Sequence, residues 1–129
     1  MTIRTRKVRT GSNLVIATLT APDQIEAGGT IRFSSFFLSV KDGAFNPTGI
    51  QAKVYEGVQR ATTLGTITPT QDDKGVGSYF ADFTVPLTQG TGPIYVTWTG
   101  TYKQSDESAA MAVQATQKVR VTNPATWVD

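Results

Sequence analysis

Apolar and polar residues largely alternate along the C-terminal part of this chain. Between residues 111 and 122, the apolar side chains share one parity, and these are Met111, Val113, Ala115, Val119 and Val121. Mostly polar and charged side chains share the other parity, from Ala112 to Thr122. A period of two is the pattern of a half-buried β-strand. The segment therefore predicts a long strand with one face toward a core and one toward water.

The same alternation predicts further strands along the chain. They cover residues 13–20, 50–54, 79–85 and 94–102, with one more short strand at 62–68. Turn-forming sequences rich in Gly, Pro, Asn and Asp separate them. The spacing favours two packed antiparallel sheets of about seven or eight strands, with a closed barrel as the alternative.

Residues 30–41 form a longer segment whose parity changes. Ile31, Phe33 and Phe37 share one parity, whereas Phe36 and the apolar residues at 38 and 40 share the other. A change of phase inside one strand predicts a β-bulge, or burial of both faces near the strand end.

Composition agrees with an all-β domain and narrows the chemistry. The 129 residues include 21 Thr, a β-branched residue that suits a pleated surface. Cys and His are both absent, which excludes disulfides, a Cys/His zinc site, thiol catalysis and a Ser-His-Asp triad. No phosphate-binding loop or dinucleotide-binding motif occurs. We therefore expect a non-enzymatic protein without a cofactor.

Charge is unevenly distributed between the N-terminus and the rest of the chain. Residues 1–10 carry Arg4, Arg6, Lys7 and Arg9 and no acidic residue. The other 119 residues carry eight basic and ten acidic side chains. We interpret residues 1–11 as a basic arm that binds an acidic protein surface. A solvated terminus is the alternative, and nucleic acid is a less favoured partner because no aromatic residues are interleaved with the cations.

The arm precedes a predicted sandwich at residues 12–122, and a tail at residues 123–129 follows it. The tail contains Trp127, a large aromatic residue in a polar segment, which we expect to pack on this domain or on a partner. The apolar run after the arm is short and interrupted by Thr, so no export signal is expected. No stretch approaches 18 apolar residues, so no membrane-spanning segment is expected either.

Several motifs together resemble a known family. They include residues 25–31 (IEAGGTI), residues 73–86 (DKGVGSYFADFTVP) and residues 95–98 (YVTW). This pattern is similar to the immunoglobulin-like β-sandwich modules of bacterial surface proteins, the macroglobulin type, and phage virion proteins. The resemblance covers about residues 20–122. It implies a fold more than a function.

Four aromatic residues are candidates for special roles. Tyr79 follows two glycines and has its hydroxyl available for a loop backbone, as in a tyrosine corner, or it is an ordinary aromatic residue at the rim. Tyr55, Phe80 and Tyr95 fall on the outward parity. We expect them to pack under a loop or against a neighbouring chain, with a glycan-binding platform as the alternative.

Paired acidic residues occur at Asp72-Asp73 and Asp106-Glu107. Both pairs lie in turn-like polar segments, which does not favour catalysis. The first pair lacks the spacing of an EF-hand, although a calcium ion at this loop is an alternative.

These features favour a structural component of a virus particle. Our leading hypothesis is a bacteriophage capsid decoration (cement) protein, made in the host cytoplasm, with the major capsid protein as partner. The basic arm and the Trp127 tail would bridge adjacent capsid subunits, and two weak attachments gain avidity together. The alternatives are a tail or fibre module that binds host glycan or protein and a bacterial surface adhesion domain; self-association is compatible with each.

Overall fold

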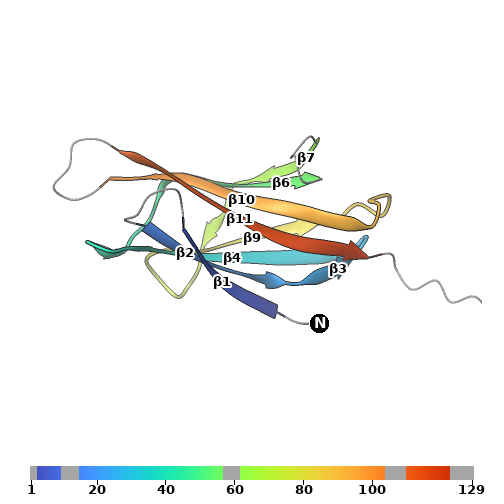
Figure 1. The fold of residues 1–129 in the computed structure, drawn as a ribbon, viewed down its shortest axis with the longest axis horizontal. Helices are drawn as coiled ribbons and strands as arrows, with labels where there is room; N and C mark the ends of the chain where they lie inside the picture. Colours follow the sequence, from blue (N-terminus) through green and yellow to red (C-terminus); the bar gives the residue numbers. More distant parts are fainter. Residues whose placement is uncertain (1–2, 10–14, 57–61, 104–109, 123–129) are drawn as a thin grey trace, which may run out of the picture.

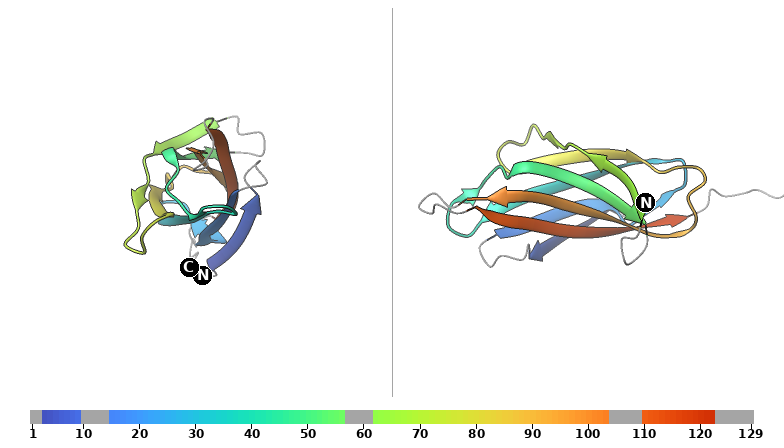
Figure 2. Two further views of the ribbon diagram at one scale, coloured as in Figure 1. Left: turned by 90° about the vertical axis from the view of Figure 1, so that its left-hand side faces the viewer. Right: turned by 90° about the horizontal axis from the view of Figure 1, so that it is seen from above.

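The all-β, two-sheet sandwich expected from the alternation is confirmed in the computed structural model. The structure describes residues 3–9, 15–56, 62–103 and 110–122. Within these residues the chain forms eleven strands and no helix. The two sheets lie face to face around a common core (Figures 1 and 2). No helix long and apolar enough to cross a membrane occurs among the residues described.

The first sheet has the strand order β1-β2-β4-β9-β8, and β5 pairs with the end of β4. All its pairings are antiparallel. The bounds of its strands are β1 Ile3–Arg9, β2 Val15–Pro22, β4 Thr30–Ser39, β5 Gly43–Ala44, β8 Thr70–Gln71 and β9 Ser78–Thr84.

The second sheet has the strand order β3-β11-β10-β6-β7. The bounds of its strands are β3 Gln24–Glu26, β6 Thr48–Glu56, β7 Thr62–Ile67, β10 Gly92–Tyr102 and β11 Met111–Thr122. The chain passes from the first sheet to the second between β2 and β3. In the second sheet, β3 pairs with β11 in parallel. At this crossing the backbone N–H of Arg120 donates to the carbonyl of Asp23 at 3.1 Å.

The core lies between the inner faces of the two sheets. The largest fully buried side chains are Trp98, Phe33, Phe37, Leu19, Ile31 and Ile94. The inward parity predicted for β9 and β11 matches their buried positions, and β10 follows it except that Thr97, on the other parity, is buried as well. Truncation of a buried aromatic side chain of this size typically costs about 3–5 kcal/mol. This core therefore dominates the stability of the sandwich.

The strand count of seven or eight is too low, because it omits β1 and the short strands β3, β5 and β8. The predicted arm at residues 1–11 also differs from the structure, in which Ile3–Arg9 is an edge strand. It pairs with β2 from Ile3 opposite Pro22 to Arg9 opposite Ile16. Backbone hydrogen bonds to β2 order this segment despite its few apolar side chains.

The phase change predicted within residues 30–41 is wrong. The buried positions of β4 alternate without interruption, and its register with β2 and β9 is unbroken. Two small polar residues, Ser35 and Ser39, occupy inward positions and conceal the true parity. Phe36, Leu38 and Val40 consequently lie on the outer face of the first sheet.

Ser39 is buried because it belongs to a hydrogen-bonded cluster with a tyrosine. Its hydroxyl lies 2.6 Å from the hydroxyl of Tyr102, which in turn donates to Asp42. The backbone N–H groups of Lys41 and Asp42 donate to the Ser39 oxygen. The ring of Tyr102 packs on Phe45 at a centroid distance of 4.4 Å. Burial is the main reason that the pKa of Tyr102 is raised, and the hydrogen bond to Asp42 adds to it.

Tyr102 therefore performs the loop-fixing role that the sequence suggested for Tyr79. Tyr79 is buried and meets Phe37 edge-on. Among the described residues, no hydrogen bond joins its hydroxyl to a loop backbone. The pKa of Tyr79 is raised by burial alone.

The turn before β9 provides a sharp test of local backbone geometry. Gly75 and Gly77 both have positive φ, at 106° and 87°. A Cβ at Gly77 would lie 2.8 Å from the Phe37 carbonyl oxygen, whereas a Cβ at Gly75 would meet nothing within 4 Å. We expect Gly75→Ala to destabilise the fold by about 1 kcal/mol from φ alone, and Gly77→Ala by clearly more. Urea unfolding of the two variants measures the difference, and equal losses would contradict the proposed clash.

Candidate functional site

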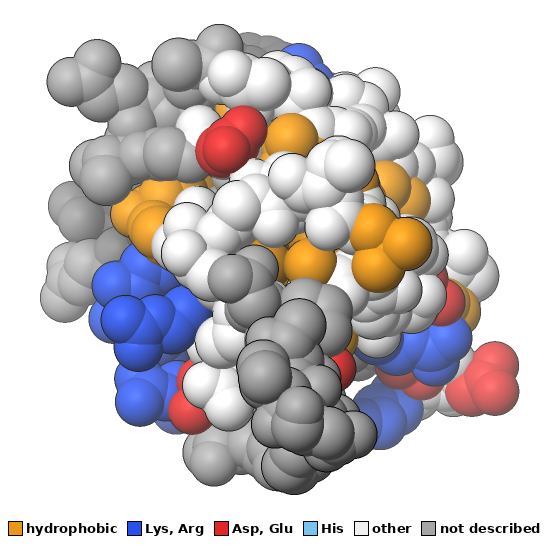
Figure 3. Space-filling view, turned by 90° about the vertical axis from the view of Figure 1, so that its right-hand side faces the viewer, with side chains coloured by type: hydrophobic (Ala, Val, Ile, Leu, Met, Phe, Trp, Pro, Cys, Tyr) orange, Lys and Arg blue, Asp and Glu red, His pale blue; other side chains and the backbone are white. Residues whose placement is uncertain are grey.

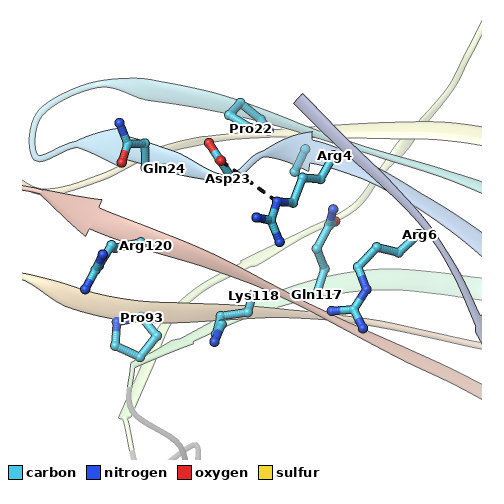
Figure 4. Close-up of a pocket in the computed structure, with 10 residues that line it drawn as sticks. Arg4, Arg6, Pro22, Asp23, Gln24, Pro93, Gln117, Lys118 and Arg120 are labelled. Atoms are coloured by element: carbon cyan, nitrogen blue, oxygen red, sulfur yellow. Dashed lines mark ion pairs between the residues drawn. The ribbon is translucent and has the colours of Figure 1, made fainter. Parts of the chain in front are cut away.

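A groove of about 470 Å³ lies where the edge of the first sheet approaches the second. Its walls come from β1 and the end of β2 on one side and from β3, β10 and β11 on the other (Figure 4). We call it the basic groove and define it by six of its lining residues, which are Arg4, Arg6, Asp23, Gln117, Lys118 and Arg120. This volume is large enough for several side chains of a ligand.

The register of β1 places two of the predicted arm residues in this groove. Arg4 lies opposite Ala21 and Arg6 lies opposite Leu19, and both of these partners are buried in the core. Directly opposed residues of antiparallel strands share one face of the sheet. Arg4 and Arg6 therefore project from the inner face of β1, beyond the edge of the core, toward β11.

Three residues of β11 form the facing wall. Lys118 and Arg120 alternate with buried residues, and the pairing of β11 with the edge strand β3 begins at Arg120. Gln117 has the inward parity and is only 5% exposed, yet it also lines the groove. Its amide lies between the side chains of Arg4 and Arg6 in the view of Figure 4.

These three residues of β11 were not predicted from the sequence. Lys118 and Arg120 lie on the parity predicted to face water, and their proximity to β1 follows only from the arrangement of the strands. One signal was present for Gln117, because it is a polar residue on the apolar parity of its strand. An amide at such a position requires a hydrogen-bonding partner or a function.

The described lining of the groove includes four cationic side chains and one carboxylate, so positive charge is in excess there. Nε of Arg4 lies 3.8 Å from Oδ2 of Asp23, and the Arg4 side chain is 68% exposed. An ion pair this long and this exposed contributes little to stability. Figure 3 shows lysine and arginine side chains in two groups, at the lower left and lower right of this end of the molecule, each with acidic side chains beside it.

Another exposed arginine, Arg32, differs from the groove cations because its guanidinium is held by close contacts within the first sheet. Two of its guanidinium nitrogens donate to the Asp82 carboxylate at 2.8 and 2.9 Å. The guanidinium also lies 4.1 Å from the centre of the Phe80 ring. Arg32 is thus engaged in structural contacts across β4 and β9, whereas the groove cations remain available to a ligand.

The other predicted partner-binding residues do not join the groove. Lys7 lies opposite Thr18, on the outer face of the first sheet. Arg9 belongs to β1, but its side chain lies outside the described part of the structure. Trp127 and the tail at 123–129 are likewise outside the described residues.

The outward aromatic residues fall into two groups. Phe80 lies under the guanidinium of Arg32 on the neighbouring strand β4. Tyr55 and Tyr95 lie directly opposite each other on β6 and β10, both half-buried on the outer face of the second sheet.

The turn containing Asp72 and Asp73 is held by its own hydrogen bonds. A carboxylate oxygen of Asp72 accepts from the backbone N–H of Lys74 at 3.1 Å, and its carbonyl accepts from Gly75. The described residues contain no group of three or more acidic, His or Cys side chains that could hold a metal ion. Asp106 and Glu107 lie outside those residues.

Comparison with known proteins yields no relative for this chain. No protein-family model, curated protein or solved structure matches it.

The Arg32–Asp82 pair makes stability depend on pH. The hydrogen bond from Arg32 lowers the pKa of Asp82 below its usual range. The pair should therefore contribute fully above the ordinary Asp pKa of about 3.9 and lose its contribution as pH falls through the lowered value. We expect the stability difference between the native protein and Asp82→Asn to vanish at the acid end. Urea unfolding between pH 6 and pH 2 tests this. Arg32→Gln should show the same dependence, and a difference that persists in acid would contradict it.

Proposed function

We propose that this protein is a non-enzymatic structural protein of a virus particle. In this proposal it is a bacteriophage capsid decoration protein that binds the shell through the basic groove. The partner is the major capsid protein or a neighbouring virion subunit. The protein would be assembled in the host cytoplasm and act in the virion.

The topology supports the immunoglobulin-like part of this proposal. In such sandwiches, one sheet contains strands A, B, E and D, and the other contains G, F, C and C′. The orders β2-β4-β9-β8 and β11-β10-β6-β7 follow the same scheme, with β1 added at the edge. The fold alone is shared by many functions, so the function must rest on the site.

The observation that carries the proposal is the convergence of uncompensated cations from two sheets. Arg4 and Arg6 come from the first sheet, and Lys118 and Arg120 come from the second. Among the described residues that line the groove, only Asp23 offsets them. A surface of this kind favours a negatively charged partner and increases its rate of association. An assembled shell with acidic patches would offer such a negatively charged surface at many equivalent positions.

One observation favours a second function. The opposed pair Tyr55 and Tyr95 offers two adjacent aromatic side chains on the outer face of the second sheet. Such a pair suits a sugar ring, as expected of a tail or fibre module that binds host glycan. Replacing either tyrosine by Ala would then abolish glycan binding, and antibody labelling would fall on the tail.

The capsid proposal predicts a charge-dependent reattachment. Capsids stripped of this protein are incubated with the native protein or with the double variant Arg6→Gln/Lys118→Gln, and occupancy is measured by sedimentation. We expect binding to weaken about tenfold, because both walls of the groove lose a cation, and to weaken further with salt. The variant should fold normally, since exposed substitutions usually change stability by less than about 0.5 kcal/mol.

The matched control is Lys53→Gln/Lys74→Gln, which removes the same charge outside the groove. It should reattach like the native protein. Equal occupancy of all three proteins would overturn the proposal, and so would reattachment that is insensitive to salt.

A further inference from the structure

We propose that the basic groove holds an extended acidic peptide segment and that Gln117 binds the main chain of this segment. The inference rests on the proposed function, since it names the chemistry of the partner at the same site. The segment would belong to the capsid partner.

The placement of the cations specifies how such a ligand would lie. Arg4 and Arg6 stand on the wall formed by β1, and Lys118 and Arg120 stand on the wall formed by β11 (Figure 4). Neighbouring side chains of an extended peptide point in opposite directions. Consecutive acidic residues would therefore reach both walls at once. Each arginine offers a fork of N–H donors that matches a carboxylate.

Gln117 adds an independent requirement. Gln117 is only 5% exposed, and its Oε1 has no hydrogen-bond partner among the described residues. A buried amide oxygen without a partner destabilises a fold. The neighbouring inward residues of β11, Ala115 and Val119, are apolar and carry no such penalty. The amide at residue 117 is therefore a candidate for ligand binding, since packing alone does not require it.

The character of this atom selects the class of ligand. Oε1 is an acceptor, so the ligand must supply a donor close to its negative charge. A polypeptide carries an N–H group at nearly every residue, and the Gln117 amide can accept from it while its own N–H₂ group donates to a carbonyl. A phosphodiester backbone carries negative charge but no N–H donor, and the N–H groups of a nucleic acid lie on its bases, away from that charge. The groove therefore fits an acidic peptide better than a nucleic acid.

Direct binding measurements test the charge requirement. A short oligoglutamate peptide is titrated into the intact protein, and Arg4→Gln/Arg6→Gln is compared with the control Lys53→Gln/Lys74→Gln. We expect at least tenfold weaker binding for the groove variant and less than a twofold change for the control. Equal weakening of both variants, or no binding by the native protein, would overturn the inference.

Gln117→Met separates a binding role from a structural one. It replaces the amide with an apolar side chain of similar size and removes the unpartnered oxygen. We expect the thermal midpoint to rise by a few degrees, roughly 2–8 °C, while peptide affinity falls about tenfold. A lower midpoint or an unchanged affinity would show that Gln117 serves packing and would overturn its assigned role.

Competing anions test the class of ligand. Inorganic polyphosphate and a single-stranded DNA oligonucleotide are titrated under the same conditions as oligoglutamate. We expect both to bind more weakly than the peptide and to be insensitive to Gln117→Met. If either binds as tightly as the peptide, the groove is a general anion site and the inference fails.

The two proposals fail in different ways. Peptide binding that requires Arg4, Arg6 and Gln117, combined with no attachment to capsids, would support the groove ligand and reject the capsid role. Capsid attachment that requires Arg6 and Lys118, combined with no peptide binding, would support the capsid role and reject the extended acidic segment.

Discussion

Each sheet of this protein has one apolar face, and the two apolar faces cover each other. Trp98 of the second sheet and Phe33 and Phe37 of the first are almost completely buried between them. The chain has no Cys and therefore no disulfides, and burial of apolar surface is the main source of its stability. The arrangement of every surface feature, including the basic groove, depends on it, because the core sets the distance between the sheets.

Packing the two sheets face to face leaves their edge strands uncovered. The basic groove lies on the side of the sandwich where β1 approaches β11. β1 ends the first sheet and pairs only with β2, while β11 pairs with the short β3 over only its last residues, Arg120–Thr122. The chain changes sheets at Asp23, so the two edges approach each other there without a shared hydrogen-bond ladder. An open edge normally invites pairing with another chain, and charged residues on edge strands oppose this. Arg4 and Arg6 fit that protective role, and this is the alternative to a role in binding.

Local pattern explains much of the fold, and its failures have identifiable causes. Alternation correctly separated the inner and outer faces of β9 and β11, because each of these strands has one solvent-facing side. It also gave the inner face of β10, although Thr97 on the opposite parity is buried too. It failed in β4, where Ser35 and Ser39 stand at inward positions, and the burial of Ser39 depends on Tyr102, which is distant in sequence. It also failed for β1, whose order comes from pairing with β2. The groove could not be predicted from the sequence for the same reason. Arg4 and Lys118 line one groove only because of the strand order. Of the groove residues, only Gln117 could be recognised from the local sequence, because it is a polar residue on the apolar parity of its strand.

Protection of an edge and binding of a ligand place different demands on the same residues. Protection requires only that β1 carry charge, and any arrangement of cations on it would serve. It does not require Lys118 and Arg120 to converge on the same groove from the other sheet, where like charges oppose the approach of the two edges. Nor does it require a buried amide oxygen without a partner at Gln117. Both features are unfavourable to the isolated protein, and both become favourable once an acidic chain supplies carboxylates and N–H donors. Edge protection accounts for Arg4 and Arg6 alone, whereas a ligand accounts for the whole groove.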